Sequence, residues 1–484
     1  MRRGVTLRRA TWGVATVVFA AIALVAVSRT VTAYLVPLLR HAPAPYGWDG
    51  LLLALGWFLV ATLLLVLAWR GANHPRARGA VLPLVIVLGA VAIRLAVAAL
   101  LDGAIYGETR IVRDQALGVL AGDCCFSHRP MGYPIVLAGA FRLLGVTPAA
   151  IELLNVALAA ATAWLTWDIG RIAWSRRVGA LAATAYAVMP SQALFALVPL
   201  TEPMFALVVA LIVRLAIAPP GRVLLATAGA GAAIALGQYV RATAAALLLP
   251  VVLLPFLGGH RLGAAAARAA GVLAVFLVLM APVIGYNLRA HQALSVSTSA
   301  YGGWSLYVGA NRQSGGQWNA ADAARLASFP GDDWWQRSEY AGSLAFDRIM
   351  EDPAGSARLL TRKFWTMWAD ETYAASYALG GSAVTQGVQV GWLGSQLLWA
   401  PLVLLAAIGM ARERRHPRPA ALLIGMSVTL TALVHLALEV HSRYHSYLVP
   451  LLCVLAAAGA SSAVRWWAAR RAGRVAAEGT APGA

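Results

Sequence analysis

Residues 80–101 read AVLPLVIVLGAVAIRLAVAALL, an apolar run in which Arg94 is the only charged residue. A helix that crosses a bilayer needs about 20 such residues, so this run predicts a transmembrane helix. Arg76 and Arg78 precede the run and Asp102 follows it. Basic residues on one side of an apolar segment and acidic residues on the other are the pattern that recurs along the chain.

Eleven further segments of this kind bring the prediction to about twelve transmembrane helices. Together with the first they lie at roughly 10–30, 50–69, 80–101, 147–170, 178–198, 203–218, 222–240, 243–258, 269–286, 388–410, 420–439 and 446–464. Hydrophobic residues make up 60% of the 484 positions and charged residues 12%, with a mean hydropathy of +0.69. A soluble protein carries about 25% charged residues, so the composition excludes a soluble enzyme. The predicted fold class is an all-α polytopic membrane protein.

Arginine clusters between alternate segments predict the orientation, because cytoplasmic loops carry the excess of basic residues. The clusters are Arg2, Arg3, Arg8 and Arg9; Arg70, Arg76 and Arg78; Arg171, Arg176 and Arg177; Arg412, Arg414, Arg415 and Arg418; and Arg465, Arg470, Arg471 and Arg474. Both termini are therefore expected in the cytoplasm. The net charge of +19 comes mostly from basic residues between apolar segments, where they set the orientation of the helices. We therefore expect membrane lipids as partners and no nucleic acid. Abundant arginine beside a single lysine is typical of a GC-rich bacterium, which predicts a bacterial cytoplasmic membrane.

Carboxylates follow the opposite distribution, and most fall on the predicted outer side. They are Asp49, Asp102, Glu108, Asp114, Asp123, Glu152, Glu202, Glu439 and the group from Asp322 to Glu371. An ionised group within the hydrocarbon costs about 3 kcal/mol or more, so these residues belong at a membrane face. Any chemistry that uses them is expected at the extracytoplasmic face.

Two outer segments are too long to be turns. Segment 102–147 is expected to hold an interfacial helix over its short apolar run 133–144, and segment 287–386 is expected to form a small extracytoplasmic insert. The predicted organisation is two N-terminal transmembrane helices (1–79), a transmembrane core with the first outer loop (80–286), the insert (287–386), and C-terminal transmembrane helices with a basic cytoplasmic tail (387–484).

The first outer loop contains GETRIVRDQALGVLAGD at 107–123 and HRPMGYP at 128–134. This pair of motifs resembles the first outer loop of the GT-C membrane glycosyltransferases, in the protein-mannosyltransferase-like and aminoarabinose-transferase-like group. That group has an acid, then a glycine, then a basic residue followed by P-P-G-Y-P. Here these positions correspond to Glu108, where Asp is usual, to Gly122, and to the run that contains Arg129 and Tyr133.

Further matches follow in the same order along the chain. Thr201-Glu202-Pro203 resembles an S/T-E pair at an outer helix end, and Arg241 resembles an arginine at the next outer turn. Pro282 to Asn287 resembles P-x-x-x-x-N, and EVHSRYHSYLVP at 439–450 resembles a closing R-Y-x-x-x-x-P run. The resemblance implies a GT-C-like fold with extracytoplasmic loop helices. It also implies a polyprenyl-phosphate-linked donor carrying mannose, arabinose or a related sugar, and an acceptor that is a glycan, a lipid or a protein.

The chemistry of such a transfer predicts which residue types are needed. A phosphate leaving group departs without a general acid, so one carboxylate base and a cationic phosphate site suffice. Arginines at outer helix ends suit phosphate, because the planar guanidinium binds its oxygens bidentately. The predicted phosphate ligands are Arg241, Arg289, Arg443 and Tyr444. Further site candidates are Arg129, Tyr133, Glu202, Asn287, Glu439 and His441.

Two alternatives remain open at this point. Glu108 is the first choice for the base, and Asp102 could reach the same cavity if the loop folds back. A transporter or flippase of lipid-linked sugars is the other functional class, although such proteins show two similar halves with charges at mid-membrane. His441 and His445 have the i,i+4 spacing of metal ligands. They fall where the chain is expected to reverse direction, so no metal site is predicted there, and a divalent cation stays possible without being indicated.

Overall fold

The computed structural model describes residues 2–41, 45–73, 81–123, 128–218, 222–331, 333–380, 384–414 and 417–478. Within these ranges the chain is helical and contains no strand, which confirms the all-α prediction. The helices are α1 (Arg2–Thr30), η1 (Val31–Leu35), α2 (Val36–His41), α3 (Gly47–Asn73), α4 (Val81–Leu100), α5 (Gly107–Ala121), α6 (Gly132–Leu144), α7 (Pro148–Ala173), α8 (Arg176–Val188), α9 (Pro190–Leu194), η3 (Phe195–Leu197), α10 (Glu202–Ala216), α11 (Val223–Val240), η5 (Ala242–Leu247), α12 (Leu248–Leu257), α13 (Leu262–His291), α14 (Gly302–Gly309), α15 (Ala320–Ala327), α16 (Trp334–Glu351), α17 (Pro353–Trp368), α18 (Tyr373–Leu379), α19 (Gln386–Arg412), α20 (Pro419–Ala437), η6 (Ser442–Leu448) and α21 (Val449–Glu478).

Nine helical spans in the described residues are long and apolar enough to cross a membrane, and each coincides with a predicted segment. The other three predicted segments are helical but shorter or bent. Segment 203–218 forms the 15-residue α10, and segment 243–258 forms η5 and α12. Segment 178–198 forms α8 and the stretch Pro190–Leu197, with an angle of 61° between them. The chain is therefore a multi-pass membrane protein, while the count of twelve and the cytoplasmic termini stay predictions.

The bend after α8 is produced by Pro190 and stabilised by Arg94. Pro190 lacks an N–H and disfavours a helical conformation at Met189, whose backbone is extended. The break frees backbone carbonyls at a depth where water is absent. Arg94 on α4 is fully buried, donates to the carbonyl oxygen of Ala187 at 3.4 Å and lies over the ring of Tyr186. Arg94, the only charged residue of the apolar run 80–101, thus supplies a hydrogen-bond donor to a carbonyl of the broken span.

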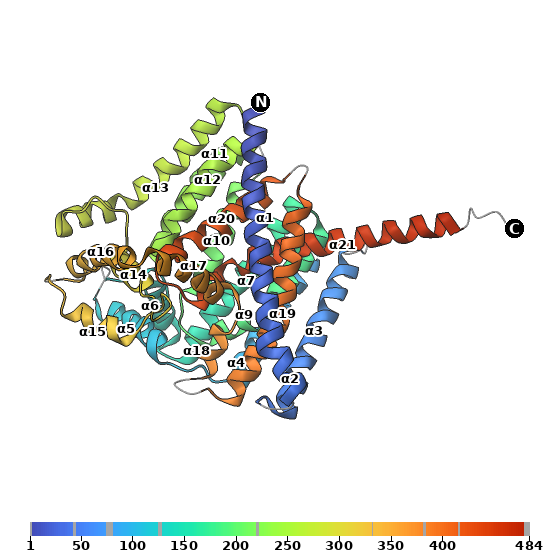
Figure 1. The fold of residues 1–484 in the computed structure, drawn as a ribbon, viewed down its shortest axis with the longest axis horizontal. Coiled ribbons are helices and arrows are strands. Elements are labelled where there is room, and N and C mark those ends of the chain that lie inside the picture. The colour runs from blue at the N-terminus through green and yellow to red at the C-terminus, as the bar shows by residue number, and fades with distance from the viewer. Residues whose placement is uncertain are drawn as a thin grey trace.

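Helices α19 and α21 approach each other closely through two glycines. At Gly409 and Gly459 an added Cβ would lie 2.1 Å from the carbonyl oxygens of Leu455 and Leu405, so only glycine permits this approach. Residues 449–458 of α21 are all buried. Past the bundle, α21 continues alone toward the right of Figure 1, whereas α5, α14, α15 and α16 gather at the left. The elements of the two predicted outer segments therefore lie together.

The first outer loop forms the two helices α5 and α6, and α6 coincides with the short helix expected over 133–144. The apolar face of α6 packs against α5 and α7, and its residue Tyr133 is fully buried. The Tyr133 hydroxyl donates to Asn155 Oδ1 at 2.9 Å. The Asn155 amide donates in turn to backbone carbonyls at the end of the stretch that follows the bend, including that of Val198 at 2.9 Å. This chain of hydrogen bonds fixes the outer loop to the broken span.

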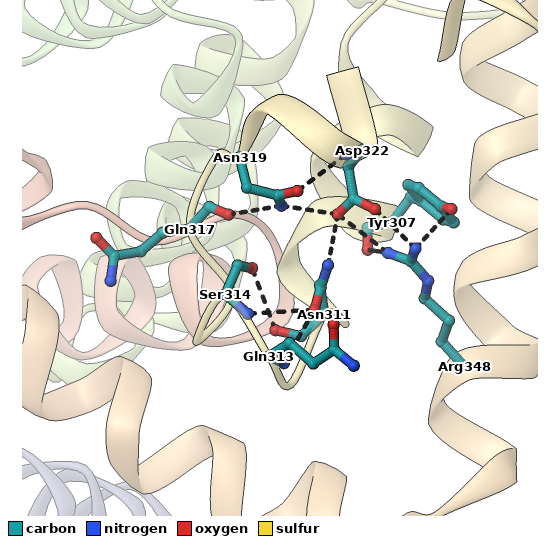
Figure 2. Close-up of polar contacts among 8 residues, drawn as sticks. All are labelled: Tyr307, Asn311, Gln313, Ser314, Gln317, Asn319, Asp322 and Arg348. Atoms are coloured by element: carbon teal, nitrogen blue, oxygen red, sulfur yellow. Dashed lines mark hydrogen bonds and ion pairs between the residues drawn. The ribbon is translucent and has the colours of Figure 1, made fainter. Parts of the chain in front are cut away.

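The segment between α13 and α19 has a small apolar core of its own and a buried polar network (Figure 2). The Asp322 carboxylate, at the start of α15, accepts from Arg348 at 2.7 Å and from the amide groups of Asn311 and Asn319 at 2.7 and 2.9 Å. The Arg348 guanidinium lies 3.5 Å from the ring centre of Tyr307. Because every member has a partner, the network can stabilise α14, α15 and α16 as one unit.

We predict that cysteine labelling of intact cells will report opposite sides for Trp318 and Arg414. Both side chains are exposed, and the arginine distribution places the first outside and the second in the cytoplasm. In a background without the native cysteines, Trp318→Cys should react with a membrane-impermeant maleimide before permeabilisation, and Arg414→Cys only afterwards. The reverse order would mean that the orientation is wrong.

Candidate functional site

The connection between α20 and η6 is the backbone on which the site is built. Helix α20 ends at Ala437, and His441 is extended, with φ −146° and ψ 153°. A short 3₁₀ turn then leads into α21. This irregular stretch belongs to the closing motif of the sequence and carries Glu439, His441 and Arg443.

Lys363 on α17 anchors this connection. Its side chain is 1% exposed, and Nζ donates to the carbonyl oxygens of Gly309 at 3.1 Å, Leu436 at 2.6 Å and Leu438 at 2.5 Å. The last two carbonyls belong to the C-terminal end of α20, where a cation is favourable. The only lysine of the chain therefore links α14 and α17 to the end of α20.

Two glycines make this close approach possible. An added Cβ on Gly309 would lie 2.5 Å from the carbonyl of Leu438, and one on Gly316 would lie 2.8 Å from Cδ of Lys363. The backbone N–H of Val440 donates to the carbonyl oxygen of Gly316 at 2.9 Å. The two glycines thus let the segment after α14 lie directly against the connection between α20 and η6.

Five charged side chains alternate in sign across the site. Arg129 Nη1 lies 2.8 Å from Glu108 Oε1, and Arg241 Nη1 lies 2.9 Å from Glu202 Oε1. Arg443 lies between the two carboxylates, with its nitrogens 3.9 Å from Glu108 Oε1 and 3.5 Å from Glu202 Oε1. Three cations thus face two anions, which leaves the group with an excess of positive charge.

Helix ends supply most of these positions. Glu108 lies in the first turn of α5 and Glu202 is the first residue of α10, where the helix dipole favours a carboxylate. Arg241 is the residue that follows α11, where the dipole favours a cation. Arg129 precedes α6 and Arg443 lies in η6. Elements far apart in the sequence therefore bring their termini to one place.

Aromatic rings line the arginines. The Arg443 guanidinium lies 5.0 Å from the ring centre of Tyr373 and 5.6 Å from that of Tyr444. The Arg241 guanidinium lies 5.1 Å from the ring of Tyr444 and 5.3 Å from that of Tyr447. These cation–π contacts hold the guanidinium planes in fixed orientations.

The environment separates the pKa values of the carboxyl groups. Burial raises the pKa of Glu108, but Arg443 and Arg129 lower it more, so its net shift is downward. Burial raises the pKa of Glu439 despite the nearby Arg443. Burial and Arg443 lower the pKa of His441 to about 3, so its imidazole is neutral. In the protein without substrate, the Glu108 carboxylate is therefore held in its charged form.

Most of the predicted site residues meet in this cluster. Those joined by ion pairs or stacked on the arginines are Glu108, Arg129, Glu202, Arg241, Arg443 and Tyr444. Glu439 and His441 adjoin it, because both interact electrostatically with Arg443. Glu202 is 1% exposed and Glu108 is 25% exposed, so only the second offers an accessible carboxylate.

Four predicted residues take no part in the ion pairs and ring contacts of the cluster. Arg289 is exposed on α13, and Asp102 is exposed in the connection between α4 and α5. The Asn287 amide donates to the carbonyl oxygens of two loop serines at 2.9 Å, so it fixes the chain after α13. Tyr133 is buried against Asn155. Asn287 and Tyr133 thus hold structural positions, whereas Arg289 and Asp102 are exposed.

Sequence reasoning did not identify Lys363, Tyr301 or Tyr373 as part of the site. Tyr301 Oη accepts a hydrogen bond from Arg129 Nη2 at 3.1 Å, and Tyr373 lies under Arg443. Lys363 could have been singled out, because it is the only lysine in a chain rich in arginine. The two tyrosines belong to a stretch with many aromatic residues, where no spacing distinguishes them.

The two histidines of the closing motif are separated by the turn. The His441 ring meets the Tyr373 ring edge to face at 4.7 Å. His445 is fully buried, with Nδ1 on the carbonyl oxygen of Met367 and Nε2 on the Glu371 carboxylate. Across the described ranges, no group of three or more His, Cys, Asp or Glu residues is placed to hold a metal ion.

No family model matches the chain, and no curated protein matches it. Several solved structures do. The oligosaccharyltransferase of Archaeoglobus fulgidus in its apo form is 12% identical, with a TM-score of 0.50 over 81% of this chain and 52% of that chain. The AglB oligosaccharyltransferase of that organism, in complex with an inhibitory peptide and a dolichol-phosphate, has a TM-score of 0.48, 11% identity and the same coverage. ArnT from Cupriavidus metallidurans bound to undecaprenyl phosphate has a TM-score of 0.37 and 14% identity, over 83% of this chain and 77% of that chain.

The chain spans about half the length of the oligosaccharyltransferase chains that it matches. At this level of identity the likeness concerns the fold. The likeness to the apo oligosaccharyltransferase confirms the GT-C-like fold that the sequence motifs predicted. The activity has to be argued from the residues of the site.

We predict that Lys363→Met will destabilise the protein by about 1–3 kcal/mol, because it leaves buried carbonyl groups without a donor. The loss should appear as a lower melting temperature of the protein purified in detergent. Arg358→Met is the matched control, since Arg358 is exposed on the same helix. An equal melting temperature for both variants would mean that Lys363 does not stabilise the connection.

Proposed function

We propose that this protein is a membrane glycosyltransferase that uses a polyprenyl-phosphate-linked sugar as its donor. The observation that carries the proposal is the alternating cluster of Arg129, Glu108, Arg443, Glu202 and Arg241 at the end of a GT-C-like helical bundle. A lipid-linked phosphate lies at headgroup depth, and excess positive charge at helix ends suits that anion. The site faces the outside of a bacterial cytoplasmic membrane in this proposal, as the arginine distribution predicts.

Arg443 is the donor-phosphate ligand. Its two ion-pair distances, 3.5 and 3.9 Å, are longer than those of Arg129 and Arg241. Its Nε is buried and has no hydrogen-bond partner among the described residues. Of the three arginines, Arg443 can therefore turn toward a phosphate at the lowest cost in existing hydrogen bonds. Arg241, held by Glu202 and Tyr444, orients the cluster around it.

Glu108 is the catalytic base. The acceptor hydroxyl gives its proton to the Glu108 carboxylate, its oxygen bonds to the anomeric carbon, and the bond from that carbon to the phosphate oxygen breaks. The electron pair leaves with the polyprenyl phosphate, whose charge Arg443 stabilises. A phosphate on the arginines competes with Glu108 for their charge, which raises the pKa of Glu108 and makes it a stronger base when donor is bound.

The acceptor and the sugar follow only from the resemblance. A mannose, an arabinose or a related sugar is the expected cargo, and a glycan, a lipid or a protein hydroxyl is the expected acceptor. The direct test incubates the purified protein with a panel of synthetic polyprenyl-phosphate sugars and measures the release of polyprenyl phosphate. If none of them is turned over while the intact lipid crosses the bilayer of a proteoliposome, the protein is a flippase.

We predict that Arg443→Ala will weaken donor binding by about tenfold or more, because a charge-assisted hydrogen bond contributes about 1.5–3 kcal/mol. Arg443→Lys should recover only part of this loss, since lysine keeps the charge without the planar fork. Arg289→Ala is the matched control and should bind donor normally. Donor affinity that is unchanged in Arg443→Ala would exclude Arg443 as the phosphate ligand.

We predict that Glu108→Gln will reduce turnover by about 10²–10⁴-fold, the range typical of a lost general base, while donor affinity stays close to normal. Glutamine keeps the shape of the side chain and an oxygen for Arg129. Asp102→Asn should change turnover little, because Asp102 is exposed and takes no part in the ion pairs of the cluster. Normal turnover in folded Glu108→Gln, combined with its loss in Asp102→Asn, would transfer the role to Asp102.

A further inference from the structure

A buried pair of titratable residues, Glu371 and His445, has no part in the proposed chemistry so far. Both side chains are buried. Nδ1 of His445 faces the carbonyl oxygen of Met367, which can only accept, so this nitrogen carries a proton. Nε2 faces the Glu371 carboxylate, so a further proton joins the two groups. Because apolar residues of the same size would stabilise the protein as well as a buried ion pair does, stability alone does not account for it.

The surroundings hold the pair in one position. The Ser191 hydroxyl donates to Glu371 Oε1 at 2.7 Å, and the Gln192 amide donates to the same oxygen at 3.3 Å. The His445 ring stacks on that of Trp399 at 4.4 Å, with an interplanar angle of 26°. Ser191 and Gln192 belong to α9, and Trp399 belongs to α19. The pair therefore ties η6 to both of these helices.

The two segments that supply the pair also supply a ring and a cation beside it. Tyr373 lies two residues after Glu371, and Arg443 lies two residues before His445. The Arg443 guanidinium lies 5.0 Å from the ring centre of Tyr373. The segments are thus joined twice, once by the buried pair and once by the cation–π contact. Because only one residue separates the two contacts on each segment, fixing the first contact restricts the second.

Arg443 depends on ring contacts for its orientation. Its nitrogens lie 3.5 and 3.9 Å from the carboxylates of Glu202 and Glu108, at or beyond the limit of hydrogen bonding. Its Nε has no hydrogen-bond partner in the part of the chain that the structure describes. The rings of Tyr373 and Tyr444 therefore do most to hold the guanidinium plane. A shift of Tyr373 would turn this plane.

Helix α18 extends the link from Arg443 to Glu108. Tyr373 is the first residue of α18, and its ring stacks on that of Tyr377 at 4.3 Å, which stacks in turn on Tyr106 at 5.2 Å. The Tyr106 hydroxyl donates to a backbone carbonyl of α18 at 3.0 Å. Tyr106 immediately precedes α5, whose first turn carries Glu108. Helix α18 therefore contacts both the proposed phosphate ligand and the start of the helix that carries the proposed base.

We propose that Glu371 and His445 form a positioning pair for the donor-phosphate site. By holding Tyr373 against the Arg443 guanidinium, the pair orients this guanidinium toward the phosphate. The inference rests on the proposed function, in which Arg443 binds that phosphate. Neither member of the pair touches the substrate, and both act through Tyr373. Loss of the pair therefore weakens donor binding and leaves the proton transfer to Glu108 in place.

The test measures the affinity for farnesyl phosphate, a short polyprenyl phosphate without a sugar, in lipid nanodiscs. Glu371→Ala removes the partner of His445 and should weaken this affinity about tenfold, the loss expected when Arg443 no longer reaches the phosphate. Glu371→Gln should bind normally, because its amide group can donate to Nε2 while Nδ1–H still donates to the backbone. Asp370→Ala is the matched control. It breaks the ion pair of the preceding residue with Arg29 on α1 and should also bind normally.

A double-mutant cycle separates positioning from a general loss of structure. Tyr373→Leu should weaken binding as much as Glu371→Ala does. The double variant should bind no more weakly than either single variant, because Glu371 acts through Tyr373. Additive losses would mean that the two residues act independently and would overturn the proposal. Normal binding by Glu371→Ala would overturn it as well.

Ser191→Ala keeps the proposal testable if Glu371→Ala does not fold. This change removes only the hydroxyl that orients Glu371 Oε1, and it should weaken binding about threefold. The loss should vanish in the Tyr373→Leu background, and unchanged affinity in Ser191→Ala alone would overturn the proposal. Normal sugar transfer combined with additive losses would reject the positioning pair alone. Coupled losses of binding without any sugar transfer would retain the pair and reject the glycosyltransferase.

Discussion

The position of Arg443 between Glu108 and Glu202 is the interaction on which the rest of the site depends. Arginines and carboxylates near the membrane are costly to remove from water unless each has a partner of opposite charge. Here the cost is offset by alternation, since each carboxylate lies between two guanidinium groups. The alternation requires the N-terminal ends of α5 and α10, the C-terminal end of α11 and the turn η6 to lie at the same place. Pairing of charges therefore sets where these helix ends lie.

Two further constraints hold this arrangement in position. Arg94 donates to the carbonyl oxygen of Ala187 at the bend after α8. The stretch beyond the bend accepts a hydrogen bond from the Asn155 amide, which supports the outer loop. Lys363 fixes the end of α20 from the opposite side, through the segment that contains the Asp322 network. Both are single cations that satisfy backbone carbonyls at irregular points of the chain. Without Arg94 and Lys363, the helix ends that carry the charged residues would not be held in fixed positions relative to one another.

The sequence predicted the spanning helices well where hydrophobicity alone decides them. In the part of the chain that the structure describes, nine apolar segments became nine long helices, because a bilayer requires length and apolar composition. Segment 178–198 meets the same two criteria yet bends, because Pro190 interrupts its hydrogen bonding and Arg94 on another helix makes the break tolerable. The proline is visible in the sequence. Its compensation by a residue almost a hundred positions earlier is visible only in the fold.

The sequence by itself determined the class of protein, the helical architecture and the types of charged residue placed at the ends of the apolar segments. These follow from local composition, since water and hydrocarbon sort residues one segment at a time. Only the tertiary structure decided which of these residues meet. Arg289 and Arg443 are alike as sequence features, both arginines at helix ends, yet one is exposed and the other lies between two carboxylates. The difference depends on how the helices pack, because a contact between distant residues is set by the relative positions of whole helices.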